Sequence, residues 1–454
     1  MSLESPVLEI DPLLDDPRTR ILVCCGSGGV GKTTTAAALG VRAAERGRKA
    51  VVLTIDPARR LAQSMGLSEL DNTPRRVAGV DESAGGELSA MMLDMKRTFD
   101  EVVLQHSDPE RARAILENPF YQSLSAGFAG TQEYMAMEKL GQLRALDAWD
   151  LIIVDTPPSR SALDFLDAPK RLGSFLDGRF IRLLMAPAKV GGRAGVKFLN
   201  LGMSMMTGTL SKVMGAQLLR DVQTFVAAMD SMFGGFRKRA DATYKLLQAN
   251  GTAFLVVAAP ERDALREASY FVERLAAEDM PLAGLVLNRV HGSGAAQLTA
   301  ERALAAAEAL EDGLQDELQS KPSEASTPLP SGEFDESAES AENLQNDGIV
   351  DQADGKAQVR ETDHASPDPE TGPEPVAEPV AEPESADRLA AGLLRLHAER
   401  MQLVARERRT RDRFVSVHPE VPMVDVAALP GDVHDLAGLR EIGERLAAGQ
   451  PTAA

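Results

Sequence analysis

Residues Gly26–Thr34, GSGGVGKTT, follow a short apolar run, RILVCC, and open an alanine-rich stretch of helical character. A strand, a glycine-rich loop and a helix in this order, with the pattern G-x-x-x-x-G-K-[ST], are typical of a phosphate-binding loop. The glycines allow main-chain N–H groups to turn towards phosphate oxygens at the positive end of the helix. We therefore expect the following residues to bind the phosphates of a nucleotide: Gly28, Gly29, Val30, Gly31, Lys32, Thr33 and Thr34.

Two side chains of this loop have separate expected roles. Lys32 would reach the β- and γ-phosphates, and Thr33 would ligate Mg²⁺. The alternative is a glycine-rich turn with a solvated lysine. The apolar run before the loop and the helical stretch after it favour phosphate binding.

Short apolar runs bounded by turn residues recur along the chain and alternate with helical stretches. This alternation predicts an α/β fold with a doubly wound, mostly parallel sheet. Two helical blocks, from about residue 96 to 148 and from about 161 to 248, lie between the strands. After RILVCC (Arg20–Cys25), the predicted strands are AVVLTID (Ala50–Asp56), LSAMMLD (Leu88–Asp94), LIIVD (Leu151–Asp155), AFLVVAA (Ala253–Ala259), LAGLVLN (Leu282–Asn288) and RFVSV (Arg413–Val417).

Several polar residues end these predicted strands. In such sheets ligands bind at the carboxyl ends of the strands, so we expect Asp56, Asp155 and Asn288 to share one rim with the phosphate loop. Pro57 restricts Asp56 to an extended backbone, which would fix its carboxylate at the mouth of the sheet. That carboxylate would orient or deprotonate the attacking water, unless it only caps the next helix. Asp155 would hold Mg²⁺ through the water shell of the ion.

The net charge of −19 belongs to one segment. Glu311–Asp387 holds 22 acidic and three basic residues, which accounts for the whole excess, so the rest of the chain is neutral. The segment also holds nine prolines and one aromatic residue, a composition that cannot bury enough apolar area to offset the entropy of ordering. We expect a disordered insertion within the domain. A globally acidic surface that repels membranes is therefore not implied.

The two cysteines, Cys24 and Cys25, are adjacent in the first predicted strand, which excludes a disulfide framework or a C-x-x-C zinc site. The acidic N-terminus lacks the basic start and apolar core of a signal peptide. No apolar run approaches the roughly 20 residues that span a bilayer. We expect a cytoplasmic protein without a transmembrane segment, acting in the cytoplasm or peripherally at a membrane.

One window within the second helical block is unusual. Gly178–Arg220 has seven basic residues, five methionines and no acidic residue. Methionine-rich surfaces suit varied apolar partners. The window is either ordinary helical core with basic edges or a surface that binds a client or a membrane.

Five blocks of the sequence, in their order and spacing, resemble the ArsA family: GSGGVGKTTTA, TIDPARRLAQSMG, VDTPPSRSALDFLDAP, AAPERDALREA and LVLNRV. The family includes arsenite-pump ATPases and the guided-entry ATPases that target tail-anchored membrane proteins. The similarity covers residues 20–310 and 389–446, and a group of actinobacterial ArsA-like ATPases shares the loop sequence CCGSGGVGKTTTA. The resemblance implies an ATPase of the P-loop class with a deviant Walker A loop, and ATP and Mg²⁺ as cofactors.

Sequence pattern and composition also give the expected organisation of the chain, and the resemblance identifies its main part as an ATPase domain. A helical subdomain, at about residues 96–248, would be inserted in the sheet domain. After the insertion, a basic helix would lead to the last strand and to a loop, Val424–Leu439. The expected parts are an N-terminal extension (1–19), the ATPase domain (20–310), the acidic insertion (311–387), the C-terminal part of the ATPase domain (388–446) and a flexible tail (447–454).

Roles of single residues follow from the same resemblance. Asp56 would be the water-activating carboxylate of the first switch, and Asp155 the metal-shell aspartate of the second. Asn288 would read the edge of the adenine, and Pro260 and Glu261 would flank the base. Members of the family form dimers in which ATP closes two protomers on one another.

Ser27 departs from the family pattern. Most members have a lysine at this position, which reaches across the dimer and stabilises charge on the phosphates of the partner. Because Ser27 carries no cation, activation within a homodimer is in question. A heterodimer with a paralogous ArsA-like ATPase that carries the lysine is the alternative.

Three functions are open at this stage. The chain is an ATP-driven switch acting on a hydrophobic or membrane-protein client, a nucleotide-binding subunit that regulates a paralogous ATPase, or a subunit of arsenite or anion transport. Arsenite binding needs soft thiolate ligands, which two cysteines inside a strand do not offer. Spatial-organiser ATPases of the ParA or MinD kind end in a membrane helix or show DNA-binding basic patches. The polar end RLAAGQPTAA does not fit a membrane anchor, and we expect no nucleic-acid partner.

Overall fold

The computed structural model describes residues 5–55, 59–124, 131–157, 225, 235, 238–320 and 383–449. By their contacts these residues belong to two units: residues 1–298 with 399–454, and residues 299–398. The first unit contains every strand of the described residues and the predicted phosphate loop. The predicted methionine-rich window, Gly178–Arg220, lies outside the described residues.

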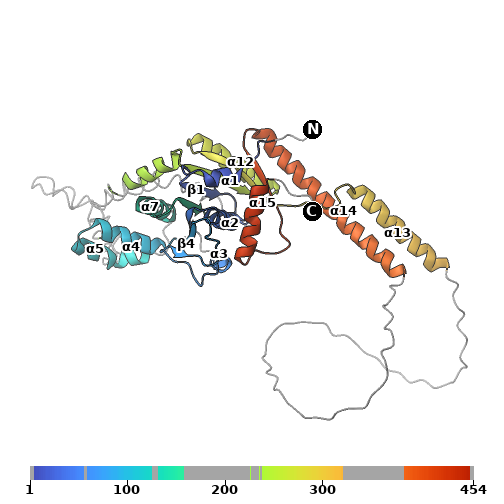
Figure 1. The fold of residues 1–454 in the computed structure, drawn as a ribbon, viewed down its shortest axis with the longest axis horizontal. Helices are drawn as coiled ribbons and strands as arrows, with labels where there is room; N and C mark the ends of the chain where they lie inside the picture. Colours follow the sequence, from blue (N-terminus) through green and yellow to red (C-terminus); the bar gives the residue numbers. More distant parts are fainter. Residues whose placement is uncertain are drawn as a thin grey trace, which may run out of the picture. The chain divides into compact units, whose positions relative to one another are not determined.

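An eight-stranded sheet forms the centre of the first unit (Figure 1), and its strands lie in the order β3-β4-β2-β5-β1-β6-β7-β8. All neighbouring strands are parallel except β3, which is antiparallel to β4. The strands are β1 (Ile21–Cys25), β2 (Lys49–Thr54), β3 (Arg75–Arg76), β4 (Glu87–Met92), β5 (Leu151–Asp155), β6 (Thr252–Ala258), β7 (Leu282–Val290) and β8 (Met423–Ala427). The prediction of a doubly wound, mostly parallel sheet is confirmed.

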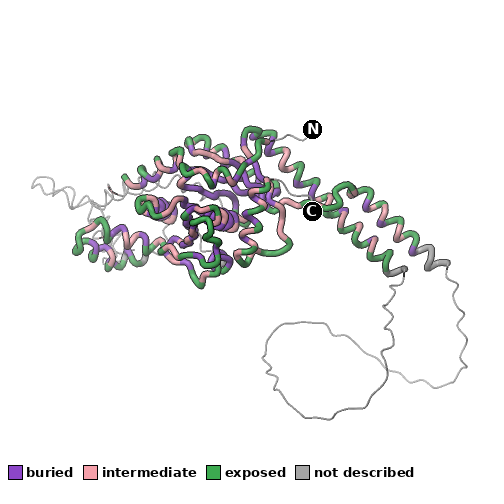
Figure 2. Tube along the Cα trace, in the orientation of Figure 1, coloured by how far each residue is buried: buried purple, intermediate pink, exposed green. Residues whose placement is uncertain are grey.

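Helices cover both faces of this sheet, because alternate residues of each strand point to opposite faces. The first face packs against α1 (Ile10–Asp15), α2 (Lys32–Glu45), α3 (Arg59–Ser64) and α15 (Leu436–Ala448). The hydrophobic core on the opposite face includes residues of α4 (Met95–His106), α5 (Pro109–Leu116), α7 (Thr131–Leu146), α12 (Arg262–Ala277) and the end of α14 (Pro383–Val417). A short helix, α6 (Pro119–Leu124), follows α5. Every residue of β1 and β5 is buried, as the central strands in Figure 2 show.

The N-terminal residues are part of this packed unit. Leu14 and Ile10 of α1 are buried, and Val7 forms a bridge with Met423 of β8. The buried Arg48 guanidinium donates hydrogen bonds to four main-chain carbonyls. Those carbonyls belong to Leu14, Asp16, Thr19 and Asp150.

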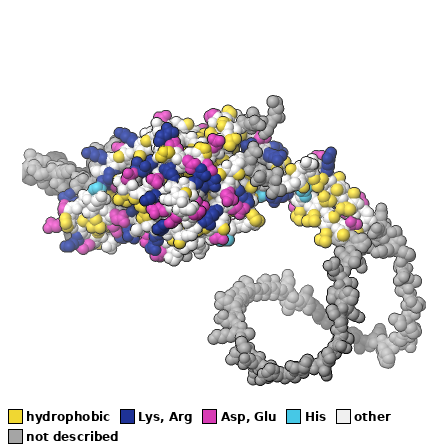
Figure 3. All heavy atoms as spheres, in the orientation of Figure 1, with side chains coloured by type: hydrophobic (Ala, Val, Ile, Leu, Met, Phe, Trp, Pro, Cys, Tyr) yellow, Lys and Arg dark blue, Asp and Glu magenta, His cyan; other side chains and the backbone are white. Residues whose placement is uncertain are grey.

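The second unit consists of α13 (Ala300–Ser320) and the first part of α14, which lie side by side in Figure 1. An ion pair of 2.5 Å joins Arg395 of α14 to Glu311 of α13. Three leucines of α14 are 63 to 68% exposed, so apolar surface remains on this unit, as Figure 3 shows. They are Leu389, Leu393 and Leu396. Within the described ranges no helix has the length and apolar character of a membrane span.

Several predicted boundaries are wrong. The run Arg413–Val417 is the end of α14, and the last described strand is β8, which begins at Met423 and runs into the start of the segment predicted to be a loop. A five-residue apolar run cannot be told from the buried face of a helix by its pattern alone, and Phe414 and Val415 are buried as part of a 35-residue helix. Helix α15 begins at Leu436, before the predicted end of that loop, and reaches Ala448.

The predicted disordered insertion is also too long at both ends. Helix α13 continues to Ser320, nine residues beyond the predicted start at Glu311, and α14 begins at Pro383, four residues before the predicted end at Asp387. Leu310 and Leu314 continue the helical spacing of apolar residues in α13. This spacing favours a helix, and at these residues it outweighs the acidic composition that predicts disorder. Residues 321–382 lie outside the described residues.

Candidate functional site

The predicted phosphate loop joins β1 to α2 at the centre of the sheet. Gly31 is the N-cap of α2, in the left-handed region at φ 94°. A Cβ at this position would lie 2.3 Å from Nδ2 of Asn288, so glycine is needed for space as well as for backbone conformation. Gly26 has the same requirement, because a Cβ there would lie 2.0 Å from the carbonyl oxygen of Val257. The loop is thus built against β6 and β7, the next two strands of the sheet.

Lys32 is buried and lies across this loop. Its Nζ donates a hydrogen bond of 2.8 Å to the carbonyl oxygen of Ser27, which ties the first turn of α2 to the start of the loop. The first turn of α2 holds no acidic residue, so its positive end is not offset by a side chain of its own. The ammonium group and the helix end together favour an anion at this position.

Thr33 and Asp155 meet directly below the loop. The Thr33 Oγ1 donates to Oδ2 of Asp155 over 2.6 Å, and Thr54 Oγ1 donates to the same oxygen over 3.0 Å. Asp155 is fully buried at the end of β5, where it pairs in register with Cys24 of β1. Parallel register therefore delivers the carboxylate to the start of α2, as the sequence predicts. Hydroxyl and carboxylate oxygens are the ligand types that Mg²⁺ prefers.

A further observation fits a nucleotide at this loop. The hydroxyl of Ser27 is buried, and among the described residues it has no hydrogen-bond partner. A buried polar atom in that condition is costly unless a ligand or water satisfies it. The loop, with its buried lysine and this hydroxyl, has the chemistry of a phosphate cradle.

Asn288 supports the loop from β7. Its Nδ2 donates to the carbonyl oxygen of Val30 over 2.8 Å, and its Oδ1 accepts from the main-chain N–H of Arg289. The side chain is buried and engaged with the phosphate loop. Recognition of adenine by Asn288 stays a prediction, whereas its contact with the loop was not foreseen. The two bonded residues, Asn288 and Val30, are 258 positions apart, so no local signal reveals the contact.

Pro260 and Glu261 follow β6 at the same edge of the sheet. Pro260 is buried, and Glu261 is the exposed N-cap of α12. Because β6 pairs in parallel with β1, both strands end at the edge that carries the phosphate loop. A contact of Pro260 and Glu261 with the base stays a prediction.

Asp56 lies outside the described residues, but the main chain that leads to it is held on both sides. The N–H of Ile55 donates to the carbonyl oxygen of Asp155 over 3.1 Å. The side-chain Nε2 of Gln132, in the first turn of α7, donates to the carbonyl oxygen of Ile55 over 3.0 Å. Sequence reasoning missed Gln132, because these partners are 77 positions apart and a lone glutamine carries no signal.

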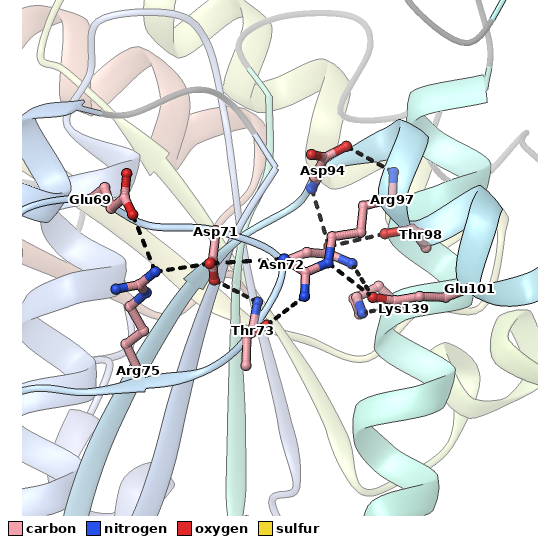
Figure 4. A network of polar contacts seen from close by, with 10 residues as sticks. All are labelled: Glu69, Asp71, Asn72, Thr73, Arg75, Asp94, Arg97, Thr98, Glu101 and Lys139. Atoms are coloured by element: carbon pink, nitrogen blue, oxygen red, sulfur yellow. Dashed lines mark hydrogen bonds and ion pairs between the residues drawn. The ribbon is translucent and has the colours of Figure 1, made fainter. Parts of the chain in front are cut away.

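Helix α7 is itself fastened to its neighbours by polar contacts. The buried Lys139 pairs with Glu101 of α4 at 2.8 Å, and Glu101 accepts a hydrogen bond from Asn72 (Figure 4). The buried Glu138 pairs with Arg239, also at 2.8 Å, and accepts from the hydroxyl of Tyr134. Arg239 belongs to the helical residues 238–248.

Both cysteines are buried in β1, as predicted. Burial raises the pKa of Cys24 well above its ordinary value, and the nearby Asp155 carboxylate raises it further. Burial also raises the pKa of Cys25 to about 12. Both groups are therefore protonated thiols at neutral pH, which are poor ligands for a soft metalloid.

Comparison with known proteins agrees with this geometry. The family model described as "Anion-transporting ATPase" matches residues 19–326. The chain is 29% identical over 231 residues to the ATPase GET3 of Phaeosphaeria nodorum, an alignment that covers 48% of this chain and 69% of that protein. It is 26% identical over 317 residues to the ATPase GET3B of Arabidopsis thaliana, covering 64% and 69%. With the ATPase ARSA2 of Chlamydomonas reinhardtii it is 26% identical over 293 residues, covering 64% and 73%.

Proposed function

Since the chain is a member of the family of anion-transporting ATPases, and so an ATP-hydrolysing enzyme, we propose that it works as a Mg²⁺-dependent switch whose nucleotide site is the loop between β1 and α2. The observation that carries this proposal is the contact between Thr33 and Asp155 at 2.6 Å. It brings the hydroxyl and the carboxylate expected around Mg²⁺ to one point beside the loop. Bound Mg²⁺ would neutralise charge on the phosphates during transfer.

Each residue of the site has a proposed role. Lys32 would exchange its bond to the Ser27 carbonyl for the phosphate oxygens, since both acceptors lie at the same loop. Thr33 would ligate Mg²⁺, and Asp155 would hold a water of its shell. Asp56 would orient the attacking water and accept its proton as the bond to the γ-phosphorus forms. Asn288 would keep the loop in shape through Val30.

Ser27 favours a second candidate, a chain that needs a partner. Its side chain supplies a buried hydroxyl and no positive charge at the start of the loop. In a homodimer of this chain, residue 27 of each protomer would therefore supply no cation to the phosphates bound by the other protomer. A paralogous ATPase with lysine there would supply the cation, and the chain would then serve as the regulated half of a heterodimer.

The client of the switch is proposed to be an apolar segment, such as part of a membrane protein. The support is the composition of Gly178–Arg220, which is rich in methionine and lacks acidic residues. The names of the three relatives, ATPase GET3, GET3B and ARSA2, support an ATPase and say nothing of a client. Anion transport is the remaining alternative, and the buried thiols of β1 speak against arsenite as its ligand.

Hydrolysis by the purified chain alone tests the proposal. We expect Mg²⁺-dependent release of phosphate from ATP, which Lys32→Ala and Asp56→Asn both abolish. Asp56→Asn should still bind ATP, because it removes only the group that acts on water. Tight ATP binding without turnover by the unaltered chain would favour the heterodimer. Turnover that survives Asp56→Asn would contradict the proposed site.

A further inference from the structure

We propose that Gln132 is a positioning residue for ATP hydrolysis, which it serves by fixing the main chain that leads into Asp56. This inference rests on the proposed role of Asp56 as the residue that orients water. It assigns to the first turn of α7 a part in hydrolysis, although α7 belongs to the helical block rather than to the nucleotide loop.

The argument begins with the peptide group between Ile55 and Asp56. The carbonyl of residue 55 and the N–H and Cα of residue 56 lie in one rigid plane. A hydrogen bond to the Ile55 oxygen therefore constrains the direction in which the chain continues. Gln132 makes that bond at 3.0 Å, and the half-buried position of its side chain protects it from competition with water.

The other side of Ile55 is anchored independently. Its N–H donates to the carbonyl oxygen of Asp155, and its side chain is buried in the core. Sheet pairing fixes where the main chain leaves β2, and the bond from Gln132 adds a separate constraint on the direction of the Ile55 carbonyl. The bond from the Ile55 N–H to the Asp155 main chain also keeps this point in register with the residue whose carboxylate is proposed to hold the metal shell.

Helix α7 gives this contact a second consequence. The pairs Lys139–Glu101 and Glu138–Arg239 join α7 to α4 and to residues 238–248 (Figure 4 shows the first pair). Glu138 and Lys139 are both buried, so breaking either pair would leave a buried charge and costs more than breaking a surface pair. The position of α7 therefore depends on its helical neighbours. Through the bond from Gln132, a shift of α7 would move the Ile55 carbonyl.

Two isosteric variants isolate the bond. Gln132→Glu keeps the shape of the side chain but removes the donor and places a carboxylate against a carbonyl oxygen. Gln132→Met removes the donor without adding charge, and serves if the charged variant folds poorly. We expect kcat to fall by about tenfold to a hundredfold in both, because misplacement of a catalytic group by an ångström costs that order. The Kd for ATP should stay within about twofold.

A pH profile adds a signature that a purely structural role would not give. Proximity to the carbonyl and partial burial raise the pKa of the new carboxyl, and its protonated form donates a hydrogen bond again. The kcat of Gln132→Glu, divided by the kcat of the unaltered chain, should therefore rise as the pH is lowered from 8 to 5.5. The same ratio for Gln132→Met should stay constant.

Gln248 provides a matched control. Its Nε2 also donates to a main-chain carbonyl, that of Glu278, over 2.8 Å, from a half-buried position in residues 238–248. Gln248→Glu makes the same chemical change away from the nucleotide loop, and its kcat should stay within about twofold. Amide hydrogen exchange without nucleotide gives an independent readout. Peptides that cover residues 51–60 should exchange faster in both Gln132 variants and not in Gln248→Glu.

The outcomes separate this inference from the proposed function. A normal kcat in both Gln132 variants, while Asp56→Asn abolishes turnover, would overturn the role of Gln132 and leave the proposed function standing. Loss of kcat together with an equal loss of ATP affinity would overturn it too, since the bond would then support the fold of the loop. Undiminished turnover in Asp56→Asn would contradict the role of Asp56 in orienting water, on which both the proposed function and the role of Gln132 rest.

Discussion

The hydroxyl of Thr33 and the carboxylate of Asp155 are in hydrogen-bond contact at 2.6 Å, although 122 residues separate them in the chain. Thr33 comes from the first turn of α2 and Asp155 from the end of β5. The two strands β1 and β5 are parallel neighbours, so the sheet itself sets this distance. The oxygens proposed to bind the metal are therefore organised by the fold before any nucleotide arrives, which reduces the cost of ordering them on binding.

Thr54 completes the support of Asp155, and its removal should be costly. Thr54→Val keeps the volume of a fully buried side chain but deletes the 3.0 Å bond to Oδ2 of Asp155. We expect the free energy of unfolding to fall by about 1.5 to 3 kcal/mol, because a hydrogen bond to a charged, buried acceptor is lost. Denaturant titration measures this. Thr54→Ser, which keeps the hydroxyl, should recover most of the hydrogen-bond contribution, and equal losses in the two variants would contradict the assignment.

Gly31 should not tolerate a side chain. In Gly31→Ala the new Cβ would collide with Asn288 Nδ2 in a backbone region that L-residues disfavour. We expect ATP affinity to fall by at least about tenfold, measured by binding of a fluorescent ATP analogue. Gly66→Ala is the matched control, since Gly66 also has a positive φ, 67°, but nothing within 4 Å of its Cβ position. It should lower stability by about 1 kcal/mol and leave ATP affinity unchanged.

The tie between α1 and α2 should make stability depend on pH. Arg42 donates two hydrogen bonds to Asp11, and these hold the pKa of that carboxyl below its ordinary value. A lowered pKa stabilises the folded protein above the unfolded-state pKa of about 3.9, and the contribution is lost as pH falls through the folded-state pKa. Asp11→Asn should lower the free energy of unfolding by about 1 kcal/mol at pH 7.

This difference between Asp11→Asn and the unaltered chain should shrink as pH falls below the unfolded-state pKa and through the lowered folded-state pKa of Asp11. Urea titrations at pH 7 and at acidic pH check both parts. Asp16→Asn is a useful comparison, because its partner Arg18 is 86% exposed and the pair should contribute little at any pH. A constant difference for Asp11→Asn across the whole pH range would contradict the role of the ion pair.

Both thiols should be inert in the folded protein. Burial raises the pKa of Cys24 and Cys25, so neither forms a reactive thiolate at pH 8. We expect an aromatic disulfide reagent to label neither cysteine in native buffer and both in strong denaturant. Rapid labelling of the native protein would show that β1 opens, and would restore these cysteines as candidate metalloid ligands.

Much of the fold follows from sequence pattern, and the exceptions have physical reasons. Apolar runs predict β1, β2, β4, β5, β6 and β7, because buried parallel strands need apolar residues on both faces. The two-residue strand β3 is at an edge and carries only arginines, so it gives no such signal. The last strand was misplaced because the end of α14 buries a short apolar run that resembles a strand.

The candidate site likewise has features that the sequence predicts and contacts that it does not. The loop, Thr33 and Asp155 follow from a motif and from the rule that parallel strands end at one edge, and the structure brings them together. The contacts Asn288–Val30 and Gln132–Ile55 join a side chain to a main-chain carbonyl. Any residue supplies such a carbonyl, so the sequence contains no trace of the partner, and three-dimensional placement alone reveals it.

The magnesium dependence of ATP hydrolysis in Asp155→Asn tests the central claim most directly. The account predicts that the unaltered chain saturates with Mg²⁺ in the presence of ATP, and that Asp155→Asn, which keeps the shape of the side chain, needs at least about tenfold more Mg²⁺ or loses turnover altogether. ATP binding without metal should change little in the variant. An identical Mg²⁺ titration for the two proteins would contradict the assignment of Thr33 and Asp155 as the metal site.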